Sequence, residues 1–297
     1  MDVLLGSTIL SRAFSSTPTT SSSSNNGPDS MVNAGRLIRN VNRAPELFVA
    51  TRLTAAYWQL LSRYLDIGSQ EYPFEVSLKS GGSLTLASTE EVRVFWNVFV
   101  RKSYVLPPLC TTILDCGANV GIFSVWAAAQ NPQARIIALE PFPETFVALE
   151  ANIRRNLLVD RVQCIRLGLA AQSGDLLMQT EGESPNRKMV LDERPEANAG
   201  TVSVPCTTLA ECLARFNIDT LDMLKMDIEG SEWPVLLSTS PVVLRRIRYI
   251  QLEYHEVAAR FGYTPKRLFS HLAAAGHRLT FRFEDRFHTG MACFERA

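Results

Sequence analysis

The sequence predicts an α/β fold, a mostly parallel sheet with helices on both faces. From residue 111 onward, short apolar runs of strand length alternate with amphipathic runs of helix length. The strand runs are continuously apolar, which is typical of parallel strands that are buried on both faces. The final two runs, HRLTFRF and GMACFERA, are instead expected to close the sheet as an antiparallel pair.

Each element of this alternation is predicted from its own pattern of apolar residues. The expected strands are TTILDC, ARIIALE, VQCIRLGLA, TVSVP, LDMLKMDI and RYIQLEY, with DLLMQT as a candidate short extra strand. The expected helices are VGIFSVWAAAQ, PETFVALEANIRRN, LAECLARF, SEWPVLLSTS and TPKRLFSHLAAAG. No internal repeat interrupts this order, so the region from 109 to 297 is predicted to be one domain.

Residues 31–108 are predicted to form a separate helical and hairpin region. Apolar residues recur at threes and fours across 34–66 and predict one amphipathic helix. FEVSLKSGGSLTLAS alternates on both sides of Gly81-Gly82, which indicates a hairpin. EEVRVFWNVFVRKSY reads as a second helix, and Pro107-Pro108 mark the entry into the main domain. This region is expected to cover a substrate site or to form a homodimer contact.

Two polar stretches are expected to lie outside the packed core. Residues 1–30 contain SSTPTTSSSSNNGPDS, whose low complexity predicts a disordered tail. Their apolar start and Arg12 faintly resemble an organelle transit peptide, but the repeated arginines of such peptides are missing, so a cytoplasmic protein is expected. The polar stretch 181–200 is interpreted either as a lid or as a disordered insertion.

Composition and charge exclude several classes of protein. The 297 residues are 46% hydrophobic, enough for one well-buried core. Lys+Arg and Asp+Glu balance at 30 each, which argues against a nucleic-acid-binding protein and against a polybasic membrane anchor. No charge-free apolar run reaches the length of about 18 residues expected of a membrane span. The six cysteines show no zinc-site spacing and are expected to be reduced.

The first predicted strand ends in ILDCGANVGIF, residues 113–123, where a ligand would bind in a parallel sheet. Gly117 allows a sharp turn, and Gly121 allows the following helix to approach closely. Asp115 stands where a dinucleotide site has its first glycine, and a carboxylate there would repel pyrophosphate. Glu140 ends the next strand and can accept hydrogen bonds from ribose hydroxyls. The pattern favours S-adenosylmethionine, which carries cationic groups and ribose hydroxyls but no phosphate, over NAD.

A second group of charged residues lies in LKMDIEGSE, where a later strand ends. Side chains alternate along a strand, so Asp227 and Glu229 are expected to share one face. They could deprotonate a substrate hydroxyl, bind a divalent cation such as magnesium, or hold a sulfonium group. Glu232 is interpreted as part of a helix cap. Glu253 and His255 end the next strand at the same edge, where His255 is a candidate general base.

These segments together resemble the FkbM family of S-adenosylmethionine-dependent methyltransferases. The resemblance covers residues 75–297 and is carried by ILDCGANVGIFS, IIALEPFPETFVALEANIRRN, LDMLKMDIEGSEWPVL and YIQLEYHE. It implies a Rossmann-like, seven-stranded methyltransferase sheet with one antiparallel strand, and O-methylation of a hydroxyl on a sugar, polyketide or other small molecule. Members of the family commonly show Thr-Leu-Asp before the second group, where this chain has Thr208-Leu209-Ala210.

The resemblance also assigns roles to individual residues. It places Asp115, Gly117, Asn119 and Gly121 on the methionine and ribose side of the cofactor. It places Glu140 at the ribose, and Asp227 and Glu229 beside the transferring methyl group.

Two alternatives to a methyltransferase remain open from the sequence. One is an NAD-dependent oxidoreductase or epimerase, against which Asp115 and the lack of a Tyr-xxx-Lys pair both argue. The other is a non-catalytic, methyltransferase-like binding module, against which the intact set of acidic residues argues. The sequence does not decide whether a metal takes part, and it does not identify the methyl acceptor.

Overall fold

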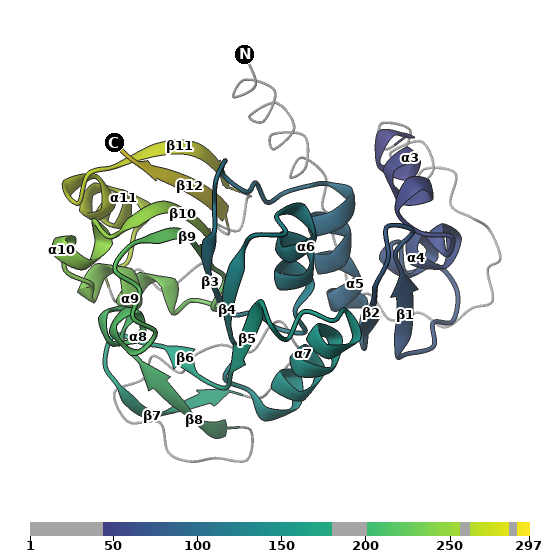
Figure 1. Ribbon diagram of the computed structural model, residues 1–297, viewed down its shortest axis with the longest axis horizontal. Coiled ribbons are helices and arrows are strands. Elements are labelled where there is room, and N and C mark those ends of the chain that lie inside the picture. Colours follow the sequence, from purple (N-terminus) through teal and green to yellow (C-terminus); the bar gives the residue numbers. More distant parts are fainter. Residues whose placement is uncertain (1–43, 180–200, 256–261, 285–289) are drawn as a thin grey trace.

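The computed structural model describes residues 44–179, 201–255, 262–284 and 290–297 (Figure 1). Its centre is a seven-stranded sheet with the order β11-β12-β10-β9-β3-β4-β5. Strands β5, β4, β3, β9 and β10 run parallel, and β12 is antiparallel to both of its neighbours. The predicted Rossmann-like sheet with one antiparallel strand is therefore confirmed. Its strands are β3 Thr112–Cys116, β4 Arg135–Leu139, β5 Val162–Ile165, β9 Leu221–Met226, β10 Ile247–Tyr254, β11 His277–Glu284 and β12 Gly290–Arg296.

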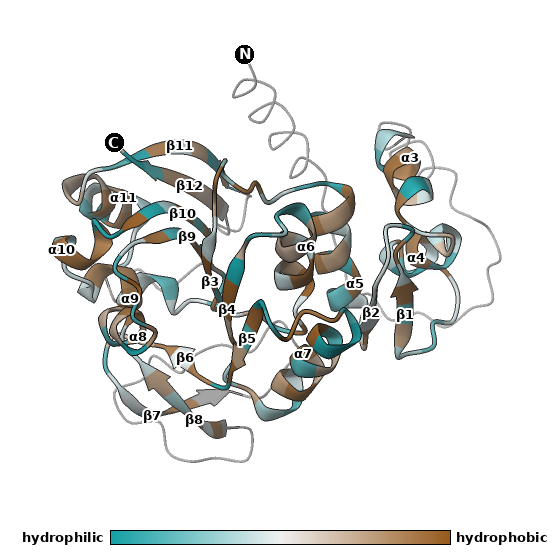
Figure 2. Cartoon of the chain, in the orientation of Figure 1, coloured by the Kyte–Doolittle hydropathy of each residue, from teal (hydrophilic) through white to brown (hydrophobic). Residues whose placement is uncertain are grey.

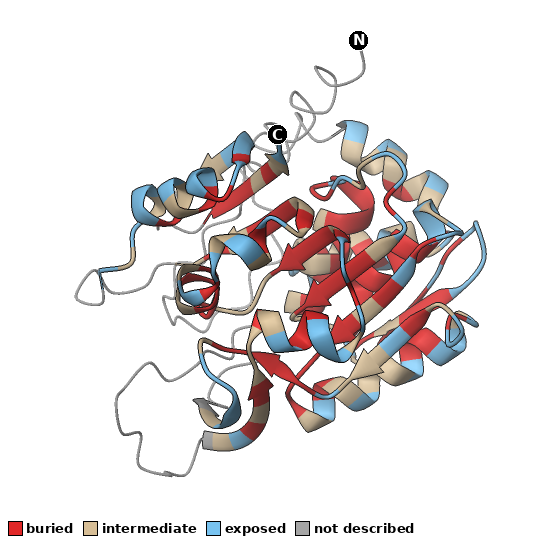
Figure 3. Cartoon of the chain, turned by 60° about the vertical axis from the view of Figure 1, so that its left-hand side comes forward, coloured by how far each residue is buried: buried red, intermediate tan, exposed pale blue. Residues whose placement is uncertain are grey.

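Helices cover both faces of this sheet, as predicted. Neighbouring residues of β3 point to opposite faces: Ile113 packs in one hydrophobic cluster and Leu114 in another. Helices α6 and α7 contribute to the Ile113 cluster, and α8, α9 and α11 contribute to the Leu114 cluster. The central strands are largely hydrophobic (Figure 2) and buried (Figure 3). The helices are α6 Ile122–Gln130, α7 Pro143–Arg155, α8 Leu209–Arg215, α9 Glu232–Ser238, α10 Pro241–Leu244 and α11 Pro265–Ala274.

The chain before β3 packs onto the α6 and α7 side of the sheet (Figure 1). Buried Leu60 and Trp96 belong to the same hydrophobic cluster as Ile113, so the core continues across residue 108. Asn152 of α7 also holds the hairpin, because its side chain accepts a hydrogen bond from the Thr85 backbone N–H at 2.9 Å. The elements here are α3 Ala44–Leu53, α4 Tyr57–Tyr64, β1 Phe74–Ser77, β2 Ser83–Leu86, α5 Thr89–Phe95 and the π-helix η2 Trp96–Val100.

The single helix expected over 34–66 is wrong within the described residues, where it is divided into α3 and α4. The break falls at Thr54, whose hydroxyl accepts a hydrogen bond from the Ala56 N–H at 3.1 Å. A side-chain acceptor of this kind competes with the helix for backbone donors. The hairpin around Gly81-Gly82 is present, and both glycines have positive φ angles.

A small second sheet, with the order β6-β8-β7, lies beside the main one. Its strands are β6 Gly168–Leu169, β7 Gly174–Gln179 and β8 Thr201–Thr207. The strand expected over 162–170 is therefore wrong as one piece, because β5 ends at Ile165 and Gly168 pairs with Cys206 of β8 instead. The proposed lid over 181–200 and the proposed tail over 1–30 both lie outside the described residues. Among the described segments, no helix has the length and apolar character needed to cross a membrane.

Candidate active site

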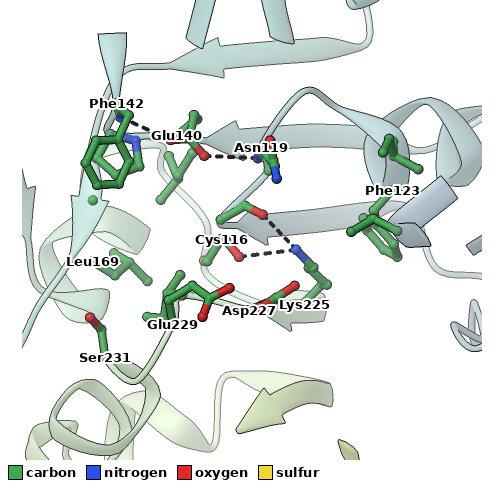
Figure 4. A pocket seen from close by; sticks show the side chains of 18 of the residues that line it. Cys116, Asn119, Phe123, Glu140, Phe142, Leu169, Lys225, Asp227, Glu229 and Ser231 are labelled. Atoms are coloured by element: carbon green, nitrogen blue, oxygen red, sulfur yellow. Dashed lines mark hydrogen bonds between the residues drawn. The ribbon is translucent and has the colours of Figure 1, made fainter. Parts of the chain in front are cut away.

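A pocket lies at the carboxyl ends of β3, β4 and β9, where parallel sheets bind their ligands (Figure 4). One wall comes from the turns that follow β3 and β4 and from the chain after β5. A second wall comes from the end of β9, and a third from the N-terminal region. The lining residues include Val94, Val98, Tyr104, Gly117, Ala118, Asn119, Phe123, Glu140, Phe142, Leu169, Lys225, Asp227 and Glu229.

The two glycines of the first turn have different tasks. Gly117 has a φ of +73°, and a Cβ built on it would lie 1.8 Å from the backbone oxygen of Asp227. Only glycine therefore lets the β3 turn meet the end of β9. Gly121 has a φ of +87°, and its Cβ would lie 2.8 Å from Leu149 of α7. Gly121 is not among the residues that line the pocket, and its close contact is with α7; the ligand contact that the resemblance implied for it stays a prediction.

Asp115 is fully buried and does not line the pocket. Its Oδ1 lies 3.2 Å from Lys225 Nζ, and its Oδ2 accepts a hydrogen bond from Ser124 Oγ at 2.7 Å. This differs from the direct ligand contact expected from the sequence. The reason is the strand register: Asp115 in β3 lies opposite Lys225 in β9, so the carboxylate already has a cationic partner.

Lys225 also contacts the turn that follows β3. Its Nζ donates a hydrogen bond to the Gly117 carbonyl at 2.8 Å (Figure 4). Burial lowers the pKa of Lys225, but the charges of Asp115 and Asp227 outweigh burial and raise it overall. The lysine is therefore a cation, and the buried pair fixes the backbone of the turn.

Glu140 connects the turns after β3 and β4 (Figure 4). One carboxylate oxygen accepts a hydrogen bond from the Asn119 N–H at 3.0 Å, and the other accepts one from the Phe142 N–H at 3.0 Å. Asn119 has a φ of +50°, a left-handed conformation that asparagine tolerates better than most residues. Both Glu140 and Asn119 line the pocket, so the structure puts these two predicted residues at the ligand space.

The structure brings together Asp227, Glu229 and His255, although they come from different strand ends. His255 Nε2 lies 3.4 Å from Glu229 Oε2 and 4.0 Å from Asp227 Oδ1. Asp227 and Glu229 line the pocket, whereas His255 stands behind them just after β10. Glu253 of β10 does not line the pocket, but it is near enough for its charge to act on Glu229.

Glu232 is more than the helix cap that the sequence suggested. It is fully buried, and its two carboxylate oxygens accept hydrogen bonds from the backbone N–H groups of Ile228 and Gly230, both at 2.8 Å. Its Oε1 also lies 3.2 Å from His255 Nδ1. Glu232 therefore fixes both the turn that carries Glu229 and the orientation of the imidazole ring. We call Asp227, Glu229, Glu232, Glu253 and His255 the acidic cluster.

Burial and mutual repulsion change the proton affinity of the acidic cluster. Burial raises the pKa of Glu229 to about 8, against the opposing effect of His255. Burial, together with the charge of Asp227, raises the pKa of Glu253 to about 7. Burial lowers the pKa of His255, but Glu232, Glu229 and Asp227 outweigh burial and raise it well above its usual value. The neighbouring carboxylates therefore favour the imidazolium form of His255, which cannot accept a further proton.

A metal ion could balance the charge of the acidic cluster in place of a protonated His255. Asp227, Glu232 and His255 each present one potential ligand atom, and these atoms lie within 4.8 Å of one another. A metal ion here would have to displace a proton from His255, and it would share the Glu232 oxygens with two backbone hydrogen bonds.

Sequence reasoning missed the wall that the N-terminal region supplies. Val94, Val98 and Tyr104 line the pocket, yet they belong to no motif. The sequence offered one indication of this wall, which is that the N-terminal region leads directly into β3. The departure at Ala210 lies on α8 and is not among the residues that line the pocket.

The strand order and the pocket at the carboxyl edge define a Rossmann-like methyltransferase fold. The chain belongs to the FkbM methyltransferase family, because residues 115–282 match the methyltransferase FkbM domain. This membership favours a methyltransferase over the alternative of an NAD-dependent oxidoreductase or epimerase.

Individual relatives are distant. The AMB antimetabolite synthetase AmbE of Pseudomonas aeruginosa is 29% identical over 61% of this chain, which matches only 10% of that protein. The 31-O-demethyl-FK506 methyltransferase FkbM of Streptomyces tacrolimicus is 27% identical over 50% of this chain and 67% of its own length. A solved structure of methyltransferase FkbM from Methylobacillus flagellatus KT aligns with 87% of this chain and 60% of its own, at 13% identity and a TM-score of 0.47.

Proposed function

We propose that this protein is an S-adenosylmethionine-dependent O-methyltransferase that acts on a hydroxyl group of a small molecule. The observation that carries the proposal is the placement of Asp227 and Glu229 on one wall of the pocket that Asn119 and Glu140 also line. The first two offer carboxylates at a reaction centre, and the other two lie where a nucleoside would bind.

The polar groups of the pocket suit the proposed cofactor. Glu140 presents a carboxylate that can accept hydrogen bonds from ribose hydroxyls. The Asp227 carboxylate suits a sulfonium ion and would repel pyrophosphate. When bound, S-adenosylmethionine supplies an electrophilic methyl group on that sulfonium. The chain itself must then align the acceptor oxygen and remove its proton.

Asp227 is the proposed proton acceptor. It lines the pocket, and its carboxylate can take the hydroxyl proton while the acceptor oxygen forms its bond to the methyl carbon. His255 stands behind Asp227 as an imidazolium ion, so its role is to balance and orient the carboxylates rather than to act as the base. Glu229 lines the same wall, but its raised pKa of about 8 leaves it mostly protonated at neutral pH.

One relative supports oxygen as the methyl acceptor. The name 31-O-demethyl-FK506 methyltransferase describes a substrate that lacks a methyl group on oxygen. A family domain with a carboxylate at the pocket wall is consistent with the same reaction type here.

The test is transfer of labelled methyl from S-adenosylmethionine to a panel of small alcohols and sugars. We expect Asp227→Asn to lower turnover by about 100-fold or more, with affinity for S-adenosylhomocysteine within about threefold of wild type. Asp219→Asn is the matched control, because Asp219 is exposed and distant from the pocket lining. Full activity of Asp227→Asn would remove Asp227 as the base.

A further inference from the structure

The wall of the pocket that the N-terminal region supplies is almost entirely apolar. Val94 of α5 and Val98 of η2 line it, and Phe123 of α6 adjoins it. Tyr104, from the chain between η2 and β3, contributes the one hydroxyl group among these four side chains. A molecule against this wall would meet hydrocarbon and a single polar group.

Tyr104 is buried, yet its hydroxyl has no hydrogen-bond partner among the described residues. Only 7% of the residue is exposed. Its ring packs against Phe123 with 5.1 Å between ring centroids at an angle of 60°. Since Tyr104 lines the pocket, its hydroxyl is available to a ligand there.

The charges around Tyr104 make it a hydrogen-bond donor. Burial raises the pKa of its phenol, and the carboxylates of Glu253 and Asp227 raise it further. Tyr104 therefore stays neutral, and it lies within the electrostatic influence of the proposed base. A hydroxyl group between Tyr104 and Asp227 would find a donor on one side and a proton acceptor on the other.

We propose that Tyr104 positions the methyl acceptor, donating a hydrogen bond to the oxygen that Asp227 deprotonates, and that the acceptor is an apolar alcohol. This inference rests on the proposed function and narrows it. A sugar would bring several hydroxyls against Val94, Val98 and Phe123, where none would find a partner. An aliphatic or aromatic alcohol brings only the hydroxyl that reacts.

The experiment compares wild type, Tyr104→Phe and the control Tyr249→Phe. Tyr249 lies in β10, and its hydroxyl donates to Glu295 outside the pocket lining. Methyl transfer is measured with benzyl alcohol, cyclohexanol and 1-octanol as apolar probes and with glucose and inositol as polar ones. We expect wild type to methylate at least one apolar probe, with kcat/KM at least about tenfold above that for either sugar.

For Tyr104→Phe we expect kcat/KM for the apolar probes to fall about tenfold, mainly through KM. Its affinity for S-adenosylhomocysteine and its melting temperature should match wild type, because the lost hydroxyl makes no hydrogen bond with the residues that the structure describes. Unchanged kinetics would overturn the assignment of Tyr104. A tenfold loss of S-adenosylhomocysteine affinity would also overturn it, by assigning Tyr104 to the cofactor.

Preference for the sugars, or no transfer to any apolar probe by a protein that binds S-adenosylhomocysteine, would overturn the acceptor class alone. A wild-type protein that does not bind S-adenosylhomocysteine would instead contradict the proposed function. The two failures are therefore distinguishable.

Discussion

Two groups of charged side chains lie at the carboxyl ends of neighbouring strands, and they differ in how their charges are balanced. Asp115 pairs with Lys225 and accepts a hydrogen bond from Ser124, all of them buried behind the first turn. The acidic cluster has four carboxyl groups and one histidine. The first group is neutral overall, and only Lys225 of it lines the pocket. The second group has an excess of carboxyl groups, of which Asp227 and Glu229 line the pocket.

The difference shows that an acidic residue at a strand end is not by itself a ligand contact. The residue opposite it in the neighbouring strand determines whether its charge is available to a ligand. Asp115 has Lys225 opposite it in the neighbouring strand, so its charge is compensated inside the protein. Asp227 shares His255 with Glu229, and its charge also acts on Lys225, which is already paired with Asp115. A carboxylate whose charge is compensated by a neighbouring cation forms a structural pair. A group of carboxyl groups whose charge is only partly compensated can bind a cation or a proton.

The largest effect should come from breaking the balanced pair. Lys225→Met leaves the Asp115 carboxylate buried without a cation, and we expect a loss of about 3–5 kcal/mol in the free energy of unfolding. Urea denaturation measures it. The control is Arg154→Met, which breaks an exposed pair with Glu150 and should cost at most about 1 kcal/mol. Equal losses in the two variants would contradict the structural role of the Asp115–Lys225 pair.

A smaller and pH-dependent effect is expected in the acidic cluster. The pKa of Glu229 is raised to about 8 in the folded protein, so the folded state holds a proton that the unfolded chain loses near its ordinary value of 4.5. Stability should therefore fall as pH rises from 4.5 through 8. The raised pKa of His255 acts in the same direction, since its stabilisation is lost as pH rises.

Glu229→Gln cannot ionise and should be less sensitive to alkaline pH. We expect its melting temperature to exceed that of wild type by about 2–4 °C at pH 9, the change that 1 kcal/mol produces in a protein of this size, with a smaller difference at pH 5. Thermal unfolding followed by circular dichroism at both pH values provides the measurement. Parallel pH profiles for the two proteins would show that Glu229 is not buried with a raised pKa.

The sequence predicts the fold well where local pattern and sheet geometry agree. Continuous apolar runs predicted the parallel strands, and the rule that strand ends meet at one edge predicted that Asp227, Glu229 and His255 would gather. The division of the helix over 34–66 depends on one hydroxyl, that of Thr54. The division of the strand over 162–170 depends on pairing with β8, which is distant in sequence.

The unpredicted parts of the site depend on tertiary contacts. The pairing of Asp115 with Lys225 follows from the register between β3 and β9, which no local pattern contains. Tyr104 reaches the pocket because the N-terminal region packs on α6, and its isolated position in the sequence carries no motif. Motif reasoning therefore found the acidic wall but not the apolar one.

The most direct test of the account is isothermal titration of the wild-type protein with S-adenosylhomocysteine and, separately, with NAD. The account predicts micromolar binding of S-adenosylhomocysteine with no requirement for added magnesium, and no binding of NAD. Binding that appears only with magnesium would contradict the assignment of His255 as the cation of the acidic cluster. Binding of NAD, or of neither ligand, would contradict the proposed cofactor and leave only the fold and the family.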